Sequence, residues 1–472
     1  MSATQSQFRV LIVGGSIAGL TLAHCLQRAN IDHLVLEKGS DIAPQLGASV
    51  GILPNGGRIL DQLNLFDTIE QFIEPTYTAN VTYPDGFTFS NVYPKTLGER
   101  FGYPIAFLDR QKLLQILYEK SHAKKNILAS KEIVKVQRIE QGVRVIAADG
   151  SQYDGSLVVG ADGVHSRIRS EIWRLAEELK PGLISTQERT CMTVEYACIF
   201  GISSQIPNLE ISEQINGLFD HLSILTIHGK KGRVFWFIIT KLPRKYTYPN
   251  VPRFSDKDAA KFMENLKHVR FFKNVCVGDL WKNREVFSMT ALEEGLFRTW
   301  FFDRMVLIGD SVHKMTTNFG QGANSAIEDA ATLSSLLYDL VHGCGVRNPS
   351  DAEIQDLLQK YHEARYDRMK MMCHTSAEVC RTQARDGLYR IFAGRYMIPY
   401  SRSIPADLAS KVMADADKIT FLSCPKNRSA LGWQTWGKEA QRATRVRRII
   451  RLLLFVALGV FCFWVSGRGS TS

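Results

Sequence analysis

Runs of apolar residues that end in glycine predict that the chain begins as a parallel α/β structure. Residues 10–13 are all aliphatic, Gly14 and Gly15 follow them, and Gly19 comes shortly afterwards. An unbroken aliphatic run is typical of a parallel strand that is covered on both faces. The glycines allow a tight turn and close packing of the next helix, whose first N–H groups then point outward. The pattern predicts a pyrophosphate site on that helix.

A second aliphatic strand, over residues 33–36, ends in Glu37. A carboxylate at this position can accept hydrogen bonds from the ribose of a dinucleotide. The glycines depart from the pattern G-x-G-x-x-G, because residue 16 is a serine. An ordinary βαβ unit with a glutamate on its surface is the alternative interpretation.

The junction of strand, glycine and helix returns twice. An aliphatic strand over 157–159 precedes the sequence GADG, and a strand over 305–308 precedes Gly309 and Asp310. A long helix then opens after the sequence GQG at 320–322 and is predicted to reach residue 342.

Alternating apolar and polar residues mark the stretch 189–300 as different. Strands are predicted over 194–200, 223–228 and 234–240. We predict an α/β fold, with a Rossmann-like dinucleotide-binding domain, an inserted mostly β substrate domain, a helical C-terminal region and a C-terminal transmembrane helix. The predicted boundaries are 1–188 and 301–345 for the binding domain, 189–300 for the β domain, 346–440 for the helical region and 449–466 for the membrane tail.

Residues 452–466 carry no charge, and Ile449 and Ile450 extend this apolar run to a length at the short end of what spans a bilayer. Arginines lie mainly on the N-terminal side of the run, which places the large domain in the cytosol. We expect a single-pass tail anchor, with the endoplasmic reticulum as its membrane. An interfacial helix and a buried terminal helix are the alternatives.

Charge and cysteine content exclude several classes of protein. The net charge is +11, but residues 426–468 hold nine Lys and Arg against one acid, so the rest is nearly neutral and a nucleic-acid surface is not expected. The nine cysteines form no C-x-x-C pair. They indicate reduced thiols in the cytosol rather than a disulfide framework or a metal site.

Two further stretches are candidates for ligand contacts. Gly51 lies in the glycine-containing sequence GASVGILPN at 47–55. A helix is predicted over 109–121, with Asp109 as its N-cap and Arg110 in its first turn. A cation there opposes the helix dipole, so an anionic ligand is one reason for Arg110, and a solvated surface arginine is the other interpretation.

The three junctions in this order, followed by GQGANSAIEDA, resemble the fingerprints of FAD-dependent monooxygenases related to p-hydroxybenzoate hydroxylase, over about residues 8–430. The resemblance implies FAD as cofactor and NAD(P)H as co-substrate. It assigns the pyrophosphate to the first glycines, the ribose to Glu37, the ribityl chain to Asp310 and the flavin edge to the helix after residue 321. The implied cofactor-binding residues are Gly14, Gly15, Gly19, Glu37, Gly51, Arg110, Asp162, Gly163, Asp310, Gly322 and Ala323.

Finer motifs narrow the resemblance. GGS at 14–16, GDSVHKM at 309–315, RVFWFIITKLP at 233–243 and the apolar tail are similar to fungal monooxygenases that epoxidise prenyl chains in meroterpenoid and indole-diterpene pathways. This implies oxygen transfer from a flavin C4a-hydroperoxide to an alkene of a prenylated substrate, and a terpene cyclase as a possible partner.

The chain also departs from these relatives. Thr316 and Thr317 stand where a proline is usual, and Phe219 stands near the place of a usual tyrosine, so no catalytic side chain is assigned. The aromatic segments 235–237 and 297–302 are predicted either to line an apolar pocket or to be plain core. Two other functions remain open: an aromatic-ring hydroxylase, and a non-enzymatic prenyl-binding protein like the GDP-dissociation inhibitors.

Overall fold

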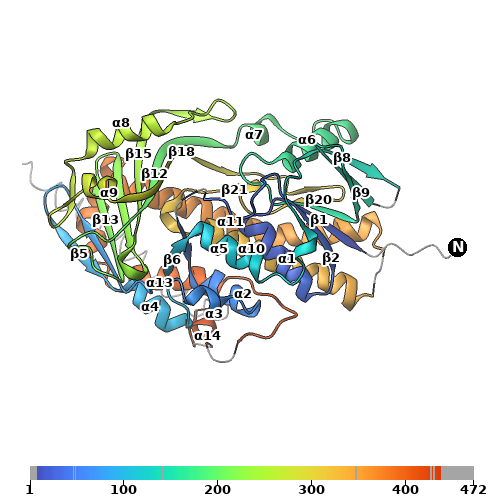
Figure 1. Cartoon of the computed structure of the whole chain (residues 1–472), viewed down its shortest axis with the longest axis horizontal. Helices are drawn as coiled ribbons and strands as arrows, with labels where there is room; N and C mark the ends of the chain where they lie inside the picture. Colours follow the sequence, from blue (N-terminus) through green and yellow to red (C-terminus); the bar gives the residue numbers. More distant parts are fainter. Residues whose placement is uncertain are drawn as a thin grey trace, which may run out of the picture.

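The computed structural model of the protein describes residues 8–45, 47, 49–140, 142–345, 348–425, 428 and 431–436. Two large sheets organise it, one of six strands and one of eight, with helices packed around both (Figure 1).

The first sheet carries the three predicted junctions. Its strands, in order across the sheet, are β19 (Phe301–Phe302), β20 (Met305–Leu307), β11 (Leu157–Gly160), β1 (Arg9–Val13), β2 (Asp32–Leu36) and β7 (Ile127–Leu128). All neighbours pair in parallel except β19 with β20. The helices that pack on this sheet or on one another are α1 (Ile17–Arg28), α5 (Arg110–Glu119), α6 (Arg167–Leu179), α10 (Gly322–Tyr338) and α11 (Asp351–Gln383). The predicted parallel α/β structure is confirmed.

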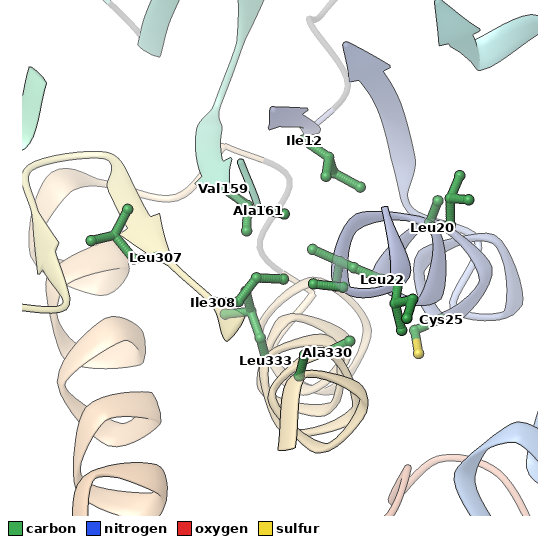
Figure 2. Close-up of a cluster of buried hydrophobic side chains, with 14 of the residues drawn as sticks. Ile12, Leu20, Leu22, Cys25, Val159, Ala161, Leu307, Ile308, Ala330 and Leu333 are labelled. Atoms are coloured by element: carbon green, nitrogen blue, oxygen red, sulfur yellow. The ribbon is translucent and has the colours of Figure 1, made fainter. Parts of the chain in front are cut away.

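The core of this part lies between the sheet and the helices α1 and α10. Figure 2 shows Ile12 of β1, Val159 of β11 and Ile308, which directly follows β20, near side chains of these two helices. All three side chains are fully buried. Burial on both faces explains why the central strands are unbroken aliphatic runs in the sequence.

The second sheet contains the predicted β-rich region. Its strands, in order, are β21 (His313–Lys314), β18 (Arg284–Leu296), β12 (Thr193–Ser203), β15 (Val234–Thr247), β14 (Leu222–His228), β13 (Glu213–Phe219), β4 (Thr78–Thr82) and β5 (Thr88–Asn91). The helices α8 (Asp256–Leu266) and α9 (Val277–Lys282) cover one face. The hairpin β4–β5 extends this sheet although it lies within the predicted binding domain, so the sheet draws on sequence outside 189–300.

The remaining elements are short. The smaller sheets pair β3 (Ser49–Ile52) with β6 (Ala106–Asp109), β16 (Arg270–Phe272) with β17 (Val275–Cys276), and join β8 (Ile133–Ile139), β9 (Gly142–Ala147) and β10 (Gln152–Gly155). The other α-helices are α2 (Pro54–Gln62), α3 (Phe66–Glu70), α4 (Tyr93–Phe101), α7 (Thr186–Arg189), α12 (Leu388–Phe392), α13 (Ile404–Ala414) and α14 (Gly432–Thr435). The 3₁₀ turns are η1 (Lys124–Asn126), η2 (Lys230–Gly232), η3 (Gly309–Ser311), η4 (Thr317–Phe319) and η7 (Ile398–Tyr400), and the π-helical turns are η5 (Asp339–Gly343) and η6 (Ala393–Met397).

No helix among the described residues is long and apolar enough to cross a membrane. The predicted tail anchor, 449–466, lies outside the described residues, as do the arginines that precede it from 442 onward.

Candidate active site

The three junctions meet at one edge of the six-stranded sheet. The carbonyl oxygen of Val13 accepts a hydrogen bond from the N–H of Ala161 at 2.8 Å. The carbonyl oxygen of Gly160 accepts from the N–H of Ile308 at 3.0 Å and from the hydroxyl of Ser311 at 2.7 Å. Because the carboxyl ends of β1, β11 and β20 are tied together in this way, the three motifs form a single site.

The first turn needs its glycines for close approach. A Cβ added to Gly19 would lie 1.9 Å from the carbonyl oxygen of Gly14. Gly14 has a φ of +110°, and a Cβ there would lie 2.3 Å from the carbonyl oxygen of Ala161. Neither position tolerates a side chain, so the predicted tight turn and close helix packing are confirmed.

Glu37 holds this turn through its carboxylate. One oxygen accepts a hydrogen bond from the N–H of Gly15 at 2.6 Å, and the other accepts from the N–H of Gly39 at 2.7 Å. A carboxylate oxygen has further lone pairs, so both oxygens can also accept from ribose hydroxyl groups. The position and chemistry of Glu37 fit its predicted role.

Ser16, the residue that breaks the glycine pattern, accepts a hydrogen bond from the guanidinium of Arg110 at 2.8 Å. Burial lowers the pKa of Arg110, and the carboxylates of Asp310 and Glu37 oppose this change. Arg110 therefore lies near Ser16, Glu37 and Asp310, at the N-terminus of α1, where an anion is favoured. The interpretation of Arg110 as a solvated surface residue is wrong.

The predicted N-cap role of Asp109 is also wrong. It stands at the N-cap position of α5, but its side chain makes no capping hydrogen bond. Its carboxylate pairs instead with Arg233, in the turn that precedes β15, at 2.5 Å. Burial raises the pKa of Asp109, and Arg233 opposes this change. Asp109 thus joins the end of β6 to the turn before β15 rather than capping α5.

Asp310, at the end of β20, forms an ion pair with Lys314. Burial alone would lower the pKa of Lys314, but Asp310 and Glu293 outweigh that effect and raise it. The carboxylate of Asp310 remains partly exposed, with 37% of its side chain accessible. It can therefore still accept hydrogen bonds from hydroxyl groups of a ligand beside Arg110.

Asp162 serves the start of α6 in the structure. Its carboxylate accepts from the Ser166 hydroxyl at 2.5 Å and from the N–H of Arg167 at 2.6 Å. Burial raises the pKa of Asp162, while these hydrogen bonds oppose the rise. Gly163 has a φ of +81° and open space where a Cβ would be. These hydrogen bonds explain Asp162 as a residue that caps the start of α6, and its contact with a cofactor stays a prediction.

The N-terminus of α10 faces the two-stranded sheet of β3 and β6. The amide of Asn324 donates to the carbonyl oxygen of Gly51 at 2.9 Å and accepts from the N–H of Leu53 at 3.1 Å. Open space surrounds Gly322 at the first helical position, and Ala323 follows it. The first N–H groups of a helix lack partners within it, so this end can bind the polar edge of a flavin and stabilise negative charge on it.

Gly51 lies in strand β3 rather than in a loop. A Cβ at this position would lie 2.8 Å from the ring of Phe107 on the paired strand β6. The ring of Phe107 also packs against the second sheet. Glycine at position 51 therefore leaves room for the ring of Phe107, which lies between β3 and the eight-stranded sheet.

Taken together, these donors and acceptors fit FAD. The N-terminus of α1 and Arg110 suit a pyrophosphate, Glu37 suits a ribose, Asp310 suits the ribityl hydroxyls and the N-terminus of α10 suits the flavin. No group of three or more His, Cys, Asp or Glu suited to a metal ion occurs among the described residues.

The sequence reasoning missed a buried charge network behind this site. Asp329 on α10 accepts from the N–H of Gly309 at 2.8 Å, from His313 at 2.6 Å and from Arg365 on α11 at 2.8 Å. Burial would raise the pKa of Asp329, but His313 and Arg365 hold it at about 2. The neighbouring Glu328 pairs with Arg365 at 2.7 Å and Arg368 at 2.6 Å. The two adjacent acids within GQGANSAIEDA, at positions otherwise suited to a core helix, are the signal for this network.

One face of the eight-stranded sheet carries a cluster of apolar side chains that packs toward Phe107 and the C-terminal end of α11. We call this cluster the inner face, and it comprises Tyr196, Cys198, Phe200, Ile202, Leu225, Ile227, Phe235, Phe237 and Ile239. Cross-strand pairing puts polar residues beside it on the same side of the sheet, namely Gln214, Asn216, Ser223, Ser288 and Thr290. Strand alternation turns Trp236 to the other face, against α8 and α9. Phe297 and Trp300 belong to the core of the first sheet. Of these five residues from the aromatic segments, Phe235 and Phe237 face this side and the other three do not.

Comparison with known proteins identifies the family. The family described as "FAD binding domain" matches residues 7–178 and 259–376. The FAD-dependent monooxygenase atmM of Aspergillus flavus is 51% identical, covering 97% of this chain and 95% of that protein. The FAD-dependent monooxygenase ptmM of Penicillium ochrochloron is 55% identical, covering 89% of this chain and 99% of that protein.

Solved structures show the same fold. Klebsiella pneumoniae HpxO in complex with FAD and uric acid has a TM-score of 0.69 at 20% identity, over 87% of this chain and 98% of that one. A substrate complex of salicylate hydroxylase has a TM-score of 0.62 at 20% identity, over 84% and 92% of the two chains. The chain belongs to the FAD binding domain family and is an FAD-dependent monooxygenase, with FAD as its cofactor and NAD(P)H as its co-substrate.

Proposed function

We propose that the protein epoxidises an alkene in the prenyl chain of a fungal secondary metabolite of the meroterpenoid type. The observation that carries this proposal is the inner face of the eight-stranded sheet. Its nine residues are apolar apart from the Tyr196 hydroxyl and the Cys198 thiol. The Tyr196 hydroxyl donates to Asp386 at 2.7 Å, which leaves its ring as the part that packs on this face.

An apolar face favours a hydrocarbon chain over a charged aromatic acid. Burying a carboxylate without a partner costs several kcal/mol, so a pocket for such a substrate needs a cation or several donors. Two cations of this region, Lys241 and Lys314, are already in ion pairs. Lys241 pairs with Asp386 at 2.7 Å, and Lys314 pairs with Asp310. These pairings favour an uncharged substrate.

Bound FAD, once reduced by NAD(P)H, supplies the activation of O₂. The residues of this chain then orient the alkene and exclude water from it. Phe107, Phe200 and Phe237 present hydrocarbon surface beside the cofactor site. Arg110 and the N-terminus of α10 would hold the cofactor there. Exclusion of water limits consumption of NAD(P)H without product.

Incubation of the FAD-loaded protein with NADPH, ¹⁸O₂ and a panel of farnesylated and geranylgeranylated aromatic compounds tests the proposal. We expect a product that carries one ¹⁸O atom in the prenyl chain and opens to a diol in acid. A phenol that lacks a prenyl chain is the control. Hydroxylation of that phenol, with no oxygen transfer to prenyl chains, would favour the aromatic-ring hydroxylase instead. The relatives, all named monooxygenases, favour either enzyme over a prenyl-binding protein without redox chemistry.

We further propose that residues 449–466 anchor the enzyme in the endoplasmic reticulum membrane, with its catalytic part in the cytosol. A prenylated substrate partitions into lipid, because each buried CH₂ is worth ~0.8 kcal/mol. A membrane terpene cyclase that consumes the epoxide is the expected partner. Alkaline carbonate extraction of fungal microsomes, with and without residues 449–466, tests the anchor.

A further inference from the structure

Large apolar side chains gather on the outside of the C-terminal helices. Exposed side chains from α12 through α13 form what we call the 388–408 face, and they include Leu388, Tyr389, Phe392, Tyr396, Tyr400 and Leu408. Leu388 is 87% exposed, Tyr389 76% and Tyr400 73%. The rings of Phe392 and Tyr396 contact each other, with centroids 5.3 Å apart. Contiguous exposed apolar surface on a globular protein indicates an interaction site.

The composition of this face suits the interface of a bilayer. Three of its six named residues are tyrosines, whose rings favour the apolar side of the lipid interface while their hydroxyls reach water. Within 388–408, Arg390 pairs with Glu378, Arg395 with Asp85 and the one acid, Asp407, with Arg100, which leaves Arg402 without a carboxylate partner among the described residues. Positive charge at Arg402 and in the sequence after residue 436 matches the anionic headgroups of a cytoplasmic leaflet.

The face is held rigidly beside the eight-stranded sheet. The Tyr83 hydroxyl, at the end of the β4–β5 hairpin, donates to the carbonyl oxygen of Gly394 at 2.5 Å. Arg395 pairs with Asp85 at 3.1 Å and lies 3.6 Å from the ring centroid of Phe87. These contacts fix the backbone under the exposed rings, so the rings do not need to fold inward to be stable.

The position of the last described residues favours a bilayer as the occupant. Trp433 and Trp436 pack in one cluster with Met413 of α13, and Arg100 lies 4.6 Å from the Trp436 ring centroid. The sequence that follows holds Lys438, Arg442 and four further arginines before the uncharged run at 452. The chain thus leaves the described structure beside α13 with further positive charge.

We propose that the 388–408 face docks on the surface of a bilayer that contains anionic lipid, with its tyrosine and phenylalanine rings at the level of the headgroups. This inference concerns the folded surface and does not depend on whether residues 449–466 span the membrane. It also places the eight-stranded sheet, through its β4–β5 edge, beside the lipid.

Photocrosslinking of the full chain tests the proposal. The variant Tyr389→p-benzoylphenylalanine is bound to vesicles of phosphatidylcholine and phosphatidylserine and irradiated. The matched control is Leu183→p-benzoylphenylalanine, because Leu183 is 49% exposed in the segment between α6 and α7, which lie on the upper side of the molecule in Figure 1, whereas α13 lies on the lower side. We expect ~10-fold more lipid adduct at position 389, and less when the vesicles lack phosphatidylserine.

Three results would overturn the proposal: equal lipid adducts at both positions, an adduct with a second copy of the chain, or an intramolecular adduct with residues 437–472. The second variant Tyr400→p-benzoylphenylalanine repeats the test should the first fail to retain FAD. The readout is a lipid adduct, so it stands even when no prenylated compound is turned over.

Discussion

Arg365 on α11 and Asp329 on α10 form an ion pair in which neither side chain has any exposed surface, with Nε and Oδ1 2.8 Å apart. Asp329 also accepts from the N–H of Gly309, so the pair fixes the turn that carries Asp310 to both helices. Helix α11 thereby positions the cofactor site without lying in it.

Loss of this pair should destabilise the protein strongly. Asp329→Asn leaves the guanidinium of Arg365 with a buried charge that is only partly compensated, at a cost of about 3–5 kcal/mol. Urea unfolding of the FAD-loaded protein, followed by circular dichroism, measures this loss. The matched control is Asp356→Asn on α11, whose pair with Lys360 is exposed and contributes little to stability. A similar effect of both substitutions would contradict the structural role given to Asp329.

Ser16 should contribute to FAD affinity through Arg110. Ser16→Ala removes the acceptor at 2.8 Å from the guanidinium, and we expect the Kd for FAD to rise ~10-fold. Equilibrium titration of the apoprotein by flavin fluorescence measures the Kd. The effect should nearly vanish in an Arg110→Met background and should be partly rescued by Ser16→Thr. An undiminished effect in the Arg110→Met background would show that Ser16 acts independently of Arg110.

The three-junction architecture could be predicted from the sequence because its causes are local. Aliphatic runs buried on both faces, and the glycines that follow them, read directly as strands and turns. Local patterns also predict a long helix from residue 351 and hairpins at 77–92 and 133–147, and these are present as α11, β4–β5 and β8–β9. Helical spacing over 57–73 predicts one helix, but the structure divides this stretch into α2 and α3 near Asn64, whose φ of +61° is incompatible with a continuous helix.

Partners that are distant in the sequence could not be predicted in this way. The sequence predicts Asp109 as a helix cap, but in the fold its carboxylate pairs with Arg233. Ser16 breaks the glycine pattern in the sequence, and the structure shows that it accepts a hydrogen bond from Arg110. Strand β4 pairs with β13, more than a hundred residues later in the chain, and thereby adds β4 and β5 to the second sheet. No local sequence pattern predicts this pairing. Side-chain pairing of this kind depends on tertiary structure.

Buried His228 should make stability fall in mild acid. Burial lowers the pKa of His228 from 6.5 to about 4, while its hydrogen bond to the Glu210 carbonyl opposes the shift. Below pH 6.5 this histidine is therefore protonated in the unfolded chain but neutral in the folded protein, so the free energy of unfolding falls until about pH 4. For this one group the loss is roughly 3 kcal/mol.

The substitution His228→Gln removes this proton uptake and keeps a side chain that can hydrogen-bond. Urea unfolding at a series of pH values should show a smaller loss of stability between pH 6.5 and pH 4 in the variant than in the wild type. Replacement of His221 by Gln is the control for loss of an exposed imidazole, and it should change the profile less than His228→Gln does. Parallel profiles for the wild type and His228→Gln would contradict burial of a neutral imidazole.

Two adjacent residues on β15 allow the proposed substrate face to be tested separately from stability. Phe237 belongs to the inner face, whereas Trp236 lies on the opposite side of the sheet, against α8 and α9. Phe237→Ala removes a ring beside the cofactor site, so we expect KM for a prenylated substrate to rise ~10-fold and more NADPH to be oxidised without product. Trp236→Phe loses the hydrogen bond from the indole N–H to the Ser203 hydroxyl, at 2.8 Å, and should lower stability while leaving KM within about twofold. Steady-state kinetics with coupled product analysis distinguishes the two variants. An equal change in KM in both would mean that the inner face does not bind the substrate.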